Sequence, residues 1–311
     1  MASRIGLVAL LASVGPMSAT GGRGGPEDAS DNVLFARTTH DVPPERIRNI
    51  GFIADSDANK AETVEHALIV GDIAGTTPAV SCFWERFMAD YSINTIDIPG
   101  HVEFTIEAER MMRVVDGVVA VLSPAGGVDP QTEVLWRAAG RLKKSRIVFV
   151  NNMDHAGAMF FRVVGELRES LGSNAVPIQI PIGEGNSFRG VIDLVRMVAR
   201  IYNPDVDTDI YGSKIPAGLT DLAREYRRKL IEAVAEMDAA LLEKSSEGGE
   251  LTADELDAAL RRGTISGAIV PVLCGAASLD RGVMLLTDAV AEKMPAPTDV
   301  PTMQGHTPDG A

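Results

Sequence analysis

The chain alternates short apolar runs with segments of helical spacing, and this alternation constrains its fold more than any other feature. The apolar runs occupy residues 50–54, 93–96, 117–122, 147–150 and 269–274. Each run is short enough to be a buried strand. Strands that alternate with helices pair mainly in parallel. The sequence therefore predicts an α/β fold with a doubly wound, mostly parallel sheet.

One helix start is clearly marked in the segment DPQTEVLWRAAG. Asp129 has a side chain suited to an N-cap, and Pro130 suits the first helical position because its missing N–H is not needed there. In open α/β sheets, ligands bind beyond the carboxyl ends of the strands. Functional residues are therefore expected in the loops that follow the apolar runs.

The loop after the first run, FIADSDANKAET at residues 52–63, only partly matches a phosphate-binding loop. Lys60 stands where the lysine of GxxxxGK[ST] would be, but Asn59 and Ala61 replace the glycine and the hydroxyl residue on either side. The sequence predicts a phosphate loop that has lost two of its defining residues.

Two further loops carry polar residues at strand ends. DIPGH at residues 97–101 has the spacing with which an aspartate reaches a magnesium ion and a glycine offers its N–H to a terminal phosphate. In NNMD, Asp154 can accept hydrogen bonds from a guanine edge and Asn151 can tie this loop to the phosphate loop. Together the three loops indicate a guanine-nucleotide site.

The segment IDIPGHVEFTIEAERMMRVVDGVVAVLSPAGGVDPQTEVLWR resembles the corresponding segment of bacterial elongation factor G, the ribosomal translocase. RIRNIGFIA, NAVPIQIPIG, FRGVIDL and IVPVLCGAASLDRGV extend the resemblance over residues 46–301. It implies a P-loop GTPase-type doubly wound sheet with an inserted α+β subdomain, GTP or GDP with Mg²⁺ as cofactors, the ribosome as partner and a cytoplasmic location.

The resemblance also implies a division into domains. Residues 1–44 are expected to be a disordered extension or a weak leader, because an apolar run at 5–14 precedes a glycine-rich polar stretch. The GTP-binding domain is expected at 45–155 and 264–297, the inserted subdomain at 156–263, and a truncated link to a missing second domain at 298–311.

The site residues follow from the same resemblance, position by position. His101 corresponds to the residue that positions the attacking water, and Asp97 to an indirect magnesium ligand. The expected nucleotide-binding residues are Asp57, Ala58, Asn59, Lys60, Ala61, Asp97, Gly100, Asn151, Asn152, Asp154, Gly275, Ala276 and Ala277.

Five positions depart from the family pattern. Asn59 replaces a glycine, Ala61 a threonine that binds magnesium, Ile98 a threonine, Asn152 a lysine that covers the guanine, and Ala276 a serine beside the base. The first switch region is also about 25 residues short, more than surface loops usually vary. We therefore expect weak nucleotide binding and very slow or absent hydrolysis. The alternatives are a pseudo-GTPase that acts as a ribosome- or protein-binding module and a decayed fragment.

The inserted subdomain has its own pattern. Residues 176–182 and 190–194 are expected to be strands, and TADE at 252–255 is a capping box that opens a helix. One face of a single long helix is predicted by Leu219, Leu222, Tyr226, Leu230, Val234, Met237 and Leu241. In the family the outer surface of this subdomain meets a ribosomal stalk protein. The charged residues that could make such a contact, or simply form a solvated face, are Arg224, Arg227, Arg228 and Lys229.

Charge and cysteine content exclude some classes. The formal net charge of −14 argues against nonspecific nucleic-acid binding, which needs lysine and arginine to displace counterions. The two cysteines give no disulfide framework and no metal-ligand spacing. The apolar run near the start is too short to span a membrane.

Overall fold

The computed structural model describes residues 42–55, 58, 63, 79–86, 89–99, 105–203 and 208–301. Its larger sheet has seven strands, in the order β2 (Ala79–Arg86), β3 (Ala89–Asp97), β1 (Ile47–Ala54), β4 (Gly117–Leu122), β5 (Ser145–Val150), β11 (Val270–Cys274) and β6 (Ala175–Pro177). β2 pairs antiparallel with β3, and all other pairs are parallel. The predicted α/β class and mostly parallel sheet are confirmed.

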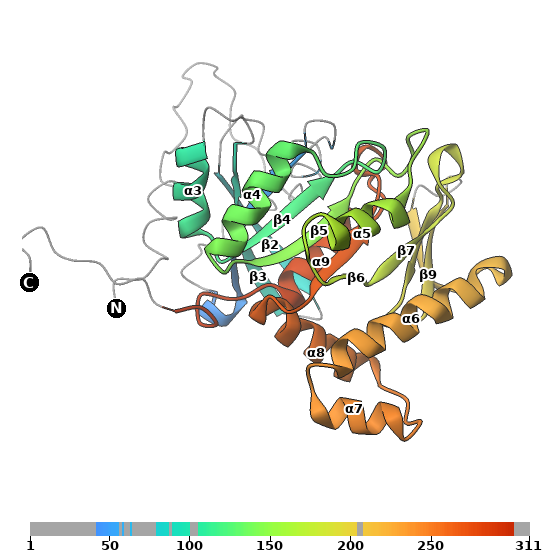
Figure 1. Ribbon diagram of the computed structural model, residues 1–311. Coiled ribbons are helices and arrows are strands. Elements are labelled where there is room, and N and C mark those ends of the chain that lie inside the picture. The colour runs from blue at the N-terminus through green and yellow to red at the C-terminus, as the bar shows by residue number, and fades with distance from the viewer. Residues whose placement is uncertain are drawn as a thin grey trace, which may run out of the picture.

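Helices cover both faces of this sheet (Figure 1). α3 (Thr105–Val114), α4 (Pro130–Arg141) and α5 (Phe160–Glu169) pack on one face, and α8 (Ala253–Ser266) and α9 (Val283–Lys293) on the other. The central strand β4 shows why two faces are possible. Its residues at even positions, including Ala120, pack with α3–α5, and those at odd positions, including Val119, pack with α8 and α9. Successive side chains point to opposite faces, so a wholly apolar strand needs cover on both.

The marked helix starts form as the sequence predicts. Asp129 accepts a hydrogen bond from Thr132 N at 2.6 Å, and Pro130 opens α4. At the start of α8, Thr252 Oγ1 accepts from Glu255 N at 3.2 Å, and the Glu255 carboxylate accepts from Thr252 N at 2.8 Å. These bonds satisfy N–H groups that have no partner within their own helix.

A smaller, antiparallel sheet has the order β10 (Thr208–Ser213), β9 (Val198–Asn203), β8 (Gly190–Asp193) and β7 (Gln179–Ile182). The single strand predicted at 176–182 is wrong, because β6 ends at Pro177 and pairs with β11, whereas β7 begins at Gln179 and pairs with β8. Pro177 has no backbone N–H to donate, which suits the edge strand of the larger sheet. The short 3₁₀ helix η4 (Gly185–Ser187) follows β7.

The smaller sheet lies within the inserted range predicted at 156–263. That range also contains α5 and β6, which belong to the layers of the larger sheet. The division into domains therefore stays a prediction.

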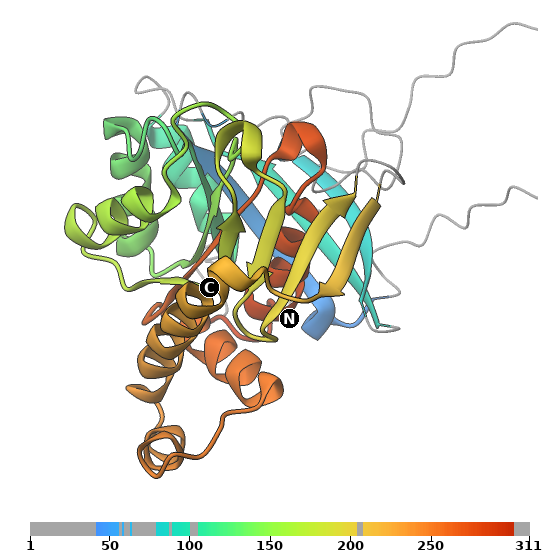
Figure 2. The ribbon, with the colours of Figure 1, turned by 90° about the vertical axis from the view of Figure 1, so that its right-hand side faces the viewer.

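The single long helix predicted from Leu219 to Leu241 is also wrong. α6 (Thr220–Ala235) ends before Met237, whose exposed fraction is 38%, and α7 (Ala239–Ser246) begins after Asp238. The Asp238 carboxylate accepts from Ala240 N at 3.1 Å and so caps a new helix. Apolar spacing continues across the break, which explains why the pattern suggested one helix. α7 projects below the body in two perpendicular views (Figure 1, Figure 2).

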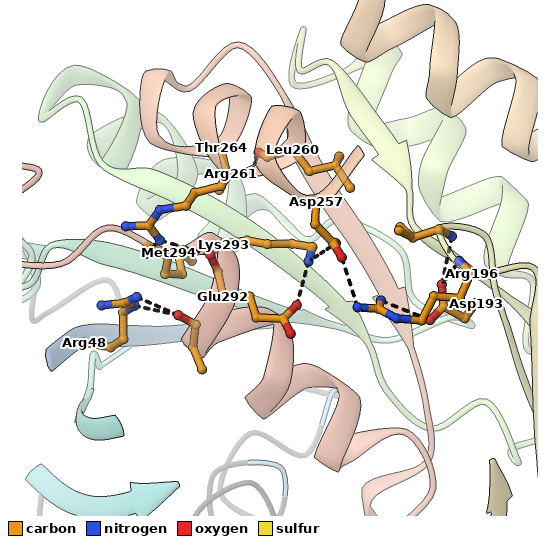
Figure 3. A network of polar contacts seen from close by, with 12 residues as sticks. Arg48, Asp193, Arg196, Asp257, Leu260, Arg261, Thr264, Glu292, Lys293 and Met294 are labelled. Carbon is orange, nitrogen blue, oxygen red and sulfur yellow. Dashed lines mark hydrogen bonds and ion pairs between the residues drawn. The ribbon is translucent and has the colours of Figure 1, made fainter. Parts of the chain in front are cut away.

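A network of charged side chains joins α8, α9 and the turn after β8 (Figure 3). Arg48 donates to Ala291 O at 2.6 Å, and Arg261 donates to Met294 O at 2.8 Å, so arginines satisfy carbonyls at the end of α9. Next to them, the buried Lys293 Nζ lies 2.8 Å from Asp257 Oδ1. Arg196, from the turn after β8, binds the other oxygen of Asp257 at 3.0 Å. The network therefore connects the smaller sheet to the helices behind the larger one.

Among the described residues, no helix combines the length and the apolar character needed to cross a membrane.

Candidate functional site

Loops from three strand ends of the larger sheet meet at Asn151, whose side chain is wholly buried. Its Nδ2 donates to Ala58 O at 2.9 Å and to Thr63 Oγ1 at 3.0 Å, both beyond β1. Its Oδ1 accepts from Ala277 N at 2.8 Å, beyond β11. One amide therefore ties the predicted phosphate loop to the two loops expected to hold the base.

The loop after β5 is held on both sides. Asn151 N donates to Leu122 O at 3.0 Å, and Met153 N donates to Gly275 O at 3.0 Å. Asn152, between them, is buried and has a φ of 58°, a left-handed conformation that asparagine tolerates better than most residues. This places the backbone of the predicted base-reading loop against the end of β11.

Asp154 is the residue predicted to read guanine. Its Oδ1 is buried, and it accepts no hydrogen bond from the part of the chain that the structure describes. A buried carboxylate oxygen without a donor costs free energy, so such atoms normally have a partner. Guanine would supply a suitable donor, and the residue therefore fits the predicted ligand.

The loop after β11 has little room for side chains. A Cβ on Gly275 would lie 2.4 Å from Arg281 O and 2.6 Å from Phe149 Cζ. Ala276 and Ala277 are wholly buried. Ala276 N donates to Arg281 O at 2.9 Å, and Arg281 N donates back to Ala276 O at 3.0 Å. The backbone of this loop is therefore held against Arg281 on one side and Asn151 on the other.

At the end of β3, one predicted site residue is exposed and the next residue is buried in the core. Asp97, the predicted magnesium ligand, is exposed at the end of the strand. Ile98, the residue after it, is wholly buried and donates its N–H to Phe52 O at 3.0 Å. A Cβ on Gly51 would lie 2.4 Å from Ile98 Cδ1. The isoleucine that departs from the family pattern therefore serves as a core residue packed across β1.

Six predicted site residues lie outside the described residues: Asp57, Asn59, Lys60, Ala61, Gly100 and His101. The predicted site residues that the structure does describe are those of the two loops expected to hold the base, and also Ala58 and Asp97. Within the described ranges, no group of three or more acidic, histidine or cysteine side chains could hold a metal ion.

Two polar residues of the site were not predicted. Asp55 follows β1 directly and is buried, and its carboxylate accepts from Ser123 N at 2.6 Å. Thr63 is buried and bonds Asn151. The position of Asp55 at a strand end was an available signal. The role of Thr63 depends on a contact between residues far apart in sequence, which no local pattern reveals.

The charged run on α6 is largely engaged within the chain. Arg227 donates to Leu194 O and Val195 O, both at 2.6 Å, and so secures the turn after β8. Lys229 pairs with Glu225 at 2.6 Å and lowers the pKa of that carboxyl, mainly through their hydrogen bond. Arg228 pairs with Glu232, and both side chains are exposed. Arg227 is therefore a structural residue.

The family model "Elongation factor Tu GTP binding domain" matches residues 72–296. A crystal structure of a protein from Thermus thermophilus is similar with a TM-score of 0.72 and 24% sequence identity. The match covers 82% of this chain and 41% of that one, and at this identity it shows a common fold.

Proposed function

The chain belongs to the elongation factor Tu GTP binding domain family, and from this premise we propose that it is an elongation-factor-G-like translational GTPase domain with weakened nucleotide chemistry. It binds guanine nucleotide weakly and hydrolyses GTP very slowly or not at all. When bound with Mg²⁺, the nucleotide supplies the phosphoanhydride bond that such domains cleave.

The base side of the site carries the proposal. Asn151 joins three loops through hydrogen bonds of 2.8–3.0 Å, and Asp154 keeps a buried oxygen without a donor among the described residues. A decayed site would not be expected to retain both the three hydrogen bonds of Asn151 and a buried Asp154 oxygen that has no donor among the described residues. This arrangement supports preference for guanine over adenine, since adenine offers an acceptor where guanine offers a donor.

The residues of the predicted phosphate loop support the proposal that nucleotide binding is weak. Asn59 puts a side chain where backbone N–H groups must approach phosphates closely, and Ala61 has no hydroxyl for magnesium. The family match begins at residue 72, after this loop. Each lost hydrogen bond to a charged group costs about 1.5–3 kcal/mol. Two such losses turn a micromolar site into one that is roughly millimolar.

The test is a calorimetric titration of the chain with GDP, with and without Mg²⁺, beside a variant that carries Asn59→Gly and Ala61→Thr. We expect weak binding that Mg²⁺ improves little, and clearly tighter, Mg²⁺-dependent binding in the variant. ATP should displace a labelled guanine nucleotide less well than GTP. Micromolar binding and ordinary turnover of GTP by the unaltered chain would contradict the proposal.

A second candidate keeps the fold without the chemistry. The five departures all fall in nucleotide loops, whereas the core runs are intact, and this pattern favours a pseudo-GTPase that acts as a ribosome- or protein-binding module. Partners by resemblance are the ribosome and, through the inserted subdomain, a ribosomal stalk protein, and the location would be cytoplasmic. No GDP binding by a chain that melts cooperatively, together with binding to ribosomes, would favour this candidate. A chain that binds neither would be a decayed fragment.

A further inference from the structure

One turn of the inserted segment, which we call the strap, contacts both loops proposed to hold the base. We define the strap as residues 183–188, between β7 and β8. Gly183 has a φ of 82°, and a Cβ there would lie 2.0 Å from Ser187 O. Ser187 Oγ donates to Glu184 O at 2.7 Å and accepts from Glu184 N at 3.1 Å. The strap is therefore a tight turn with its own internal bonds.

The strap contacts the loop after β5 at one end. Gly185 N donates to Met153 O at 2.9 Å, one residue before Asp154. Gly185 has a φ of 57°, and a Cβ there would lie 3.4 Å from His155 O, so its backbone approaches the loop closely. The strap therefore binds the backbone of the predicted base-reading loop through the Met153 carbonyl.

Arg281 holds the other end of the strap. Its Nη1 donates to Phe188 O at 2.6 Å, and its guanidinium lies 4.2 Å from the centre of the Tyr202 ring on β9. Phe188 is 2% exposed, and its N–H donates to Gly185 O at 2.9 Å. A guanidinium that both stacks and donates is held more rigidly than a lysine would be. Arg281 therefore joins the strap to the loop after β11.

These contacts close into a ring. The backbone of Arg281 exchanges two hydrogen bonds with Ala276, and the neighbouring Gly275 O accepts a hydrogen bond from Met153 N. Met153 is also the residue whose carbonyl accepts from the strap, at Gly185 N. The hydrogen bonds of the ring are 2.6–3.0 Å long, and the peptide bond between Gly275 and Ala276 completes it. A closed ring restricts each member more than an open chain of the same bonds, because no single segment can move alone.

We propose that the strap and Arg281 form a clamp that sets the relative position of the two base-holding loops, so that the inserted segment is a positioning element for guanine selection. Arg281 acts through Phe188 and Gly185 and is a positioning residue. This inference rests on the proposed function, since the clamp would act on guanine selection at the proposed nucleotide site.

The first test needs no nucleotide. Amide hydrogen exchange is measured on the full chain and on Arg281→Ala, Arg281→Lys and Arg189→Ala. Arg189 is exposed and adjacent to Phe188, so its replacement removes the same charge without breaking the ring. We expect exchange at Met153 and Gly185 to rise about tenfold in Arg281→Ala, less in Arg281→Lys, and not at all in Arg189→Ala. Unchanged exchange in Arg281→Ala would overturn the clamp.

The second test measures selection. Ligand-observed NMR, which reaches millimolar affinities, gives the Kd of GDP and of inosine diphosphate, which lacks the 2-amino donor proposed to meet Asp154. The Kd of inosine diphosphate divided by the Kd of GDP should fall about fivefold in Arg281→Ala and stay unchanged in Arg189→Ala, since coupling between sites is of this order. An unchanged ratio would refute the role in selection. A chain that binds no GDP would refute the proposed function and the role in selection together, while exchange would still decide whether the clamp exists.

Discussion

Replacing Asn151 by alanine should destabilise the chain strongly, even without nucleotide. Asn151 is wholly buried, and its amide bonds Ala58 O at 2.9 Å, Thr63 Oγ1 at 3.0 Å and Ala277 N at 2.8 Å. Alanine removes all three bonds. Ala58 and Ala277 are themselves wholly buried, so their carbonyl and N–H lose partners that water does not readily replace.

The magnitude follows from the groups left without partners. Each buried polar group that loses its partner costs about 1–3 kcal/mol, so two of them cost about 4 kcal/mol together. In a domain of this size each kcal/mol lowers Tm by roughly 2 °C, which gives a decrease of about 8 °C. The effect is a sizeable part of the 5–15 kcal/mol that typically separates folded from unfolded chains.

The assay is thermal unfolding followed by circular dichroism, supported by urea unfolding at 25 °C. The matched control is Asn174→Ala, because Asn174 is exposed and its Nδ2 makes one bond, to Ala268 O at 3.1 Å. The control should lose less than about 1 kcal/mol. If Asn151→Ala and Asn174→Ala melted at the same temperature, Asn151 would not join the three loops as described.

Two further predictions concern charged groups. The Lys244 ammonium, with the Thr252 N–H, lowers the pKa of Glu255 from 4.5 to about 2, so the stability it contributes is complete above about pH 4.5 and is lost as pH falls toward 2. The Tm difference between the unaltered chain and Glu255→Gln should therefore be constant above pH 5 and shrink below pH 4.5, and a difference independent of pH would contradict this linkage. Lys293→Met should cost about 2 kcal/mol in urea unfolding, because the Asp257 carboxylate loses its partner at 2.8 Å but keeps Arg196 at 3.0 Å. Arg224→Ala, in an exposed pair, should cost less than about 0.5 kcal/mol.

Local patterns predicted most of the larger sheet. The run at 117–122 matches β4 residue for residue, and the caps at Asp129 and Thr252 form as expected. These features depend on a residue and its near neighbours, so sequence alone carries the information. The errors arose where a pattern continued across a break, at Pro177 between two sheets and at Asp238 between two helices.

The candidate site was predictable in part. Asn151 and Asp154 were expected at the end of β5, because parallel strands bring their carboxyl ends to one edge. The loss of the threonine at position 98 was visible in the sequence as a departure from the family. Its consequence was not, since burial of Ile98 against Gly51 requires β1 and β3 to lie in register.

The sequence by itself determined the α/β class, the order of the strand-forming runs and the residues whose type suits a guanine site. The tertiary structure alone decided how those residues are held. Asn151 bonds residues 93 positions before it and 126 positions after it, and Arg281 reaches Phe188 across 93 positions. Propensity and periodicity act over a few residues, whereas such bonds form only after the sheet has brought distant loops together.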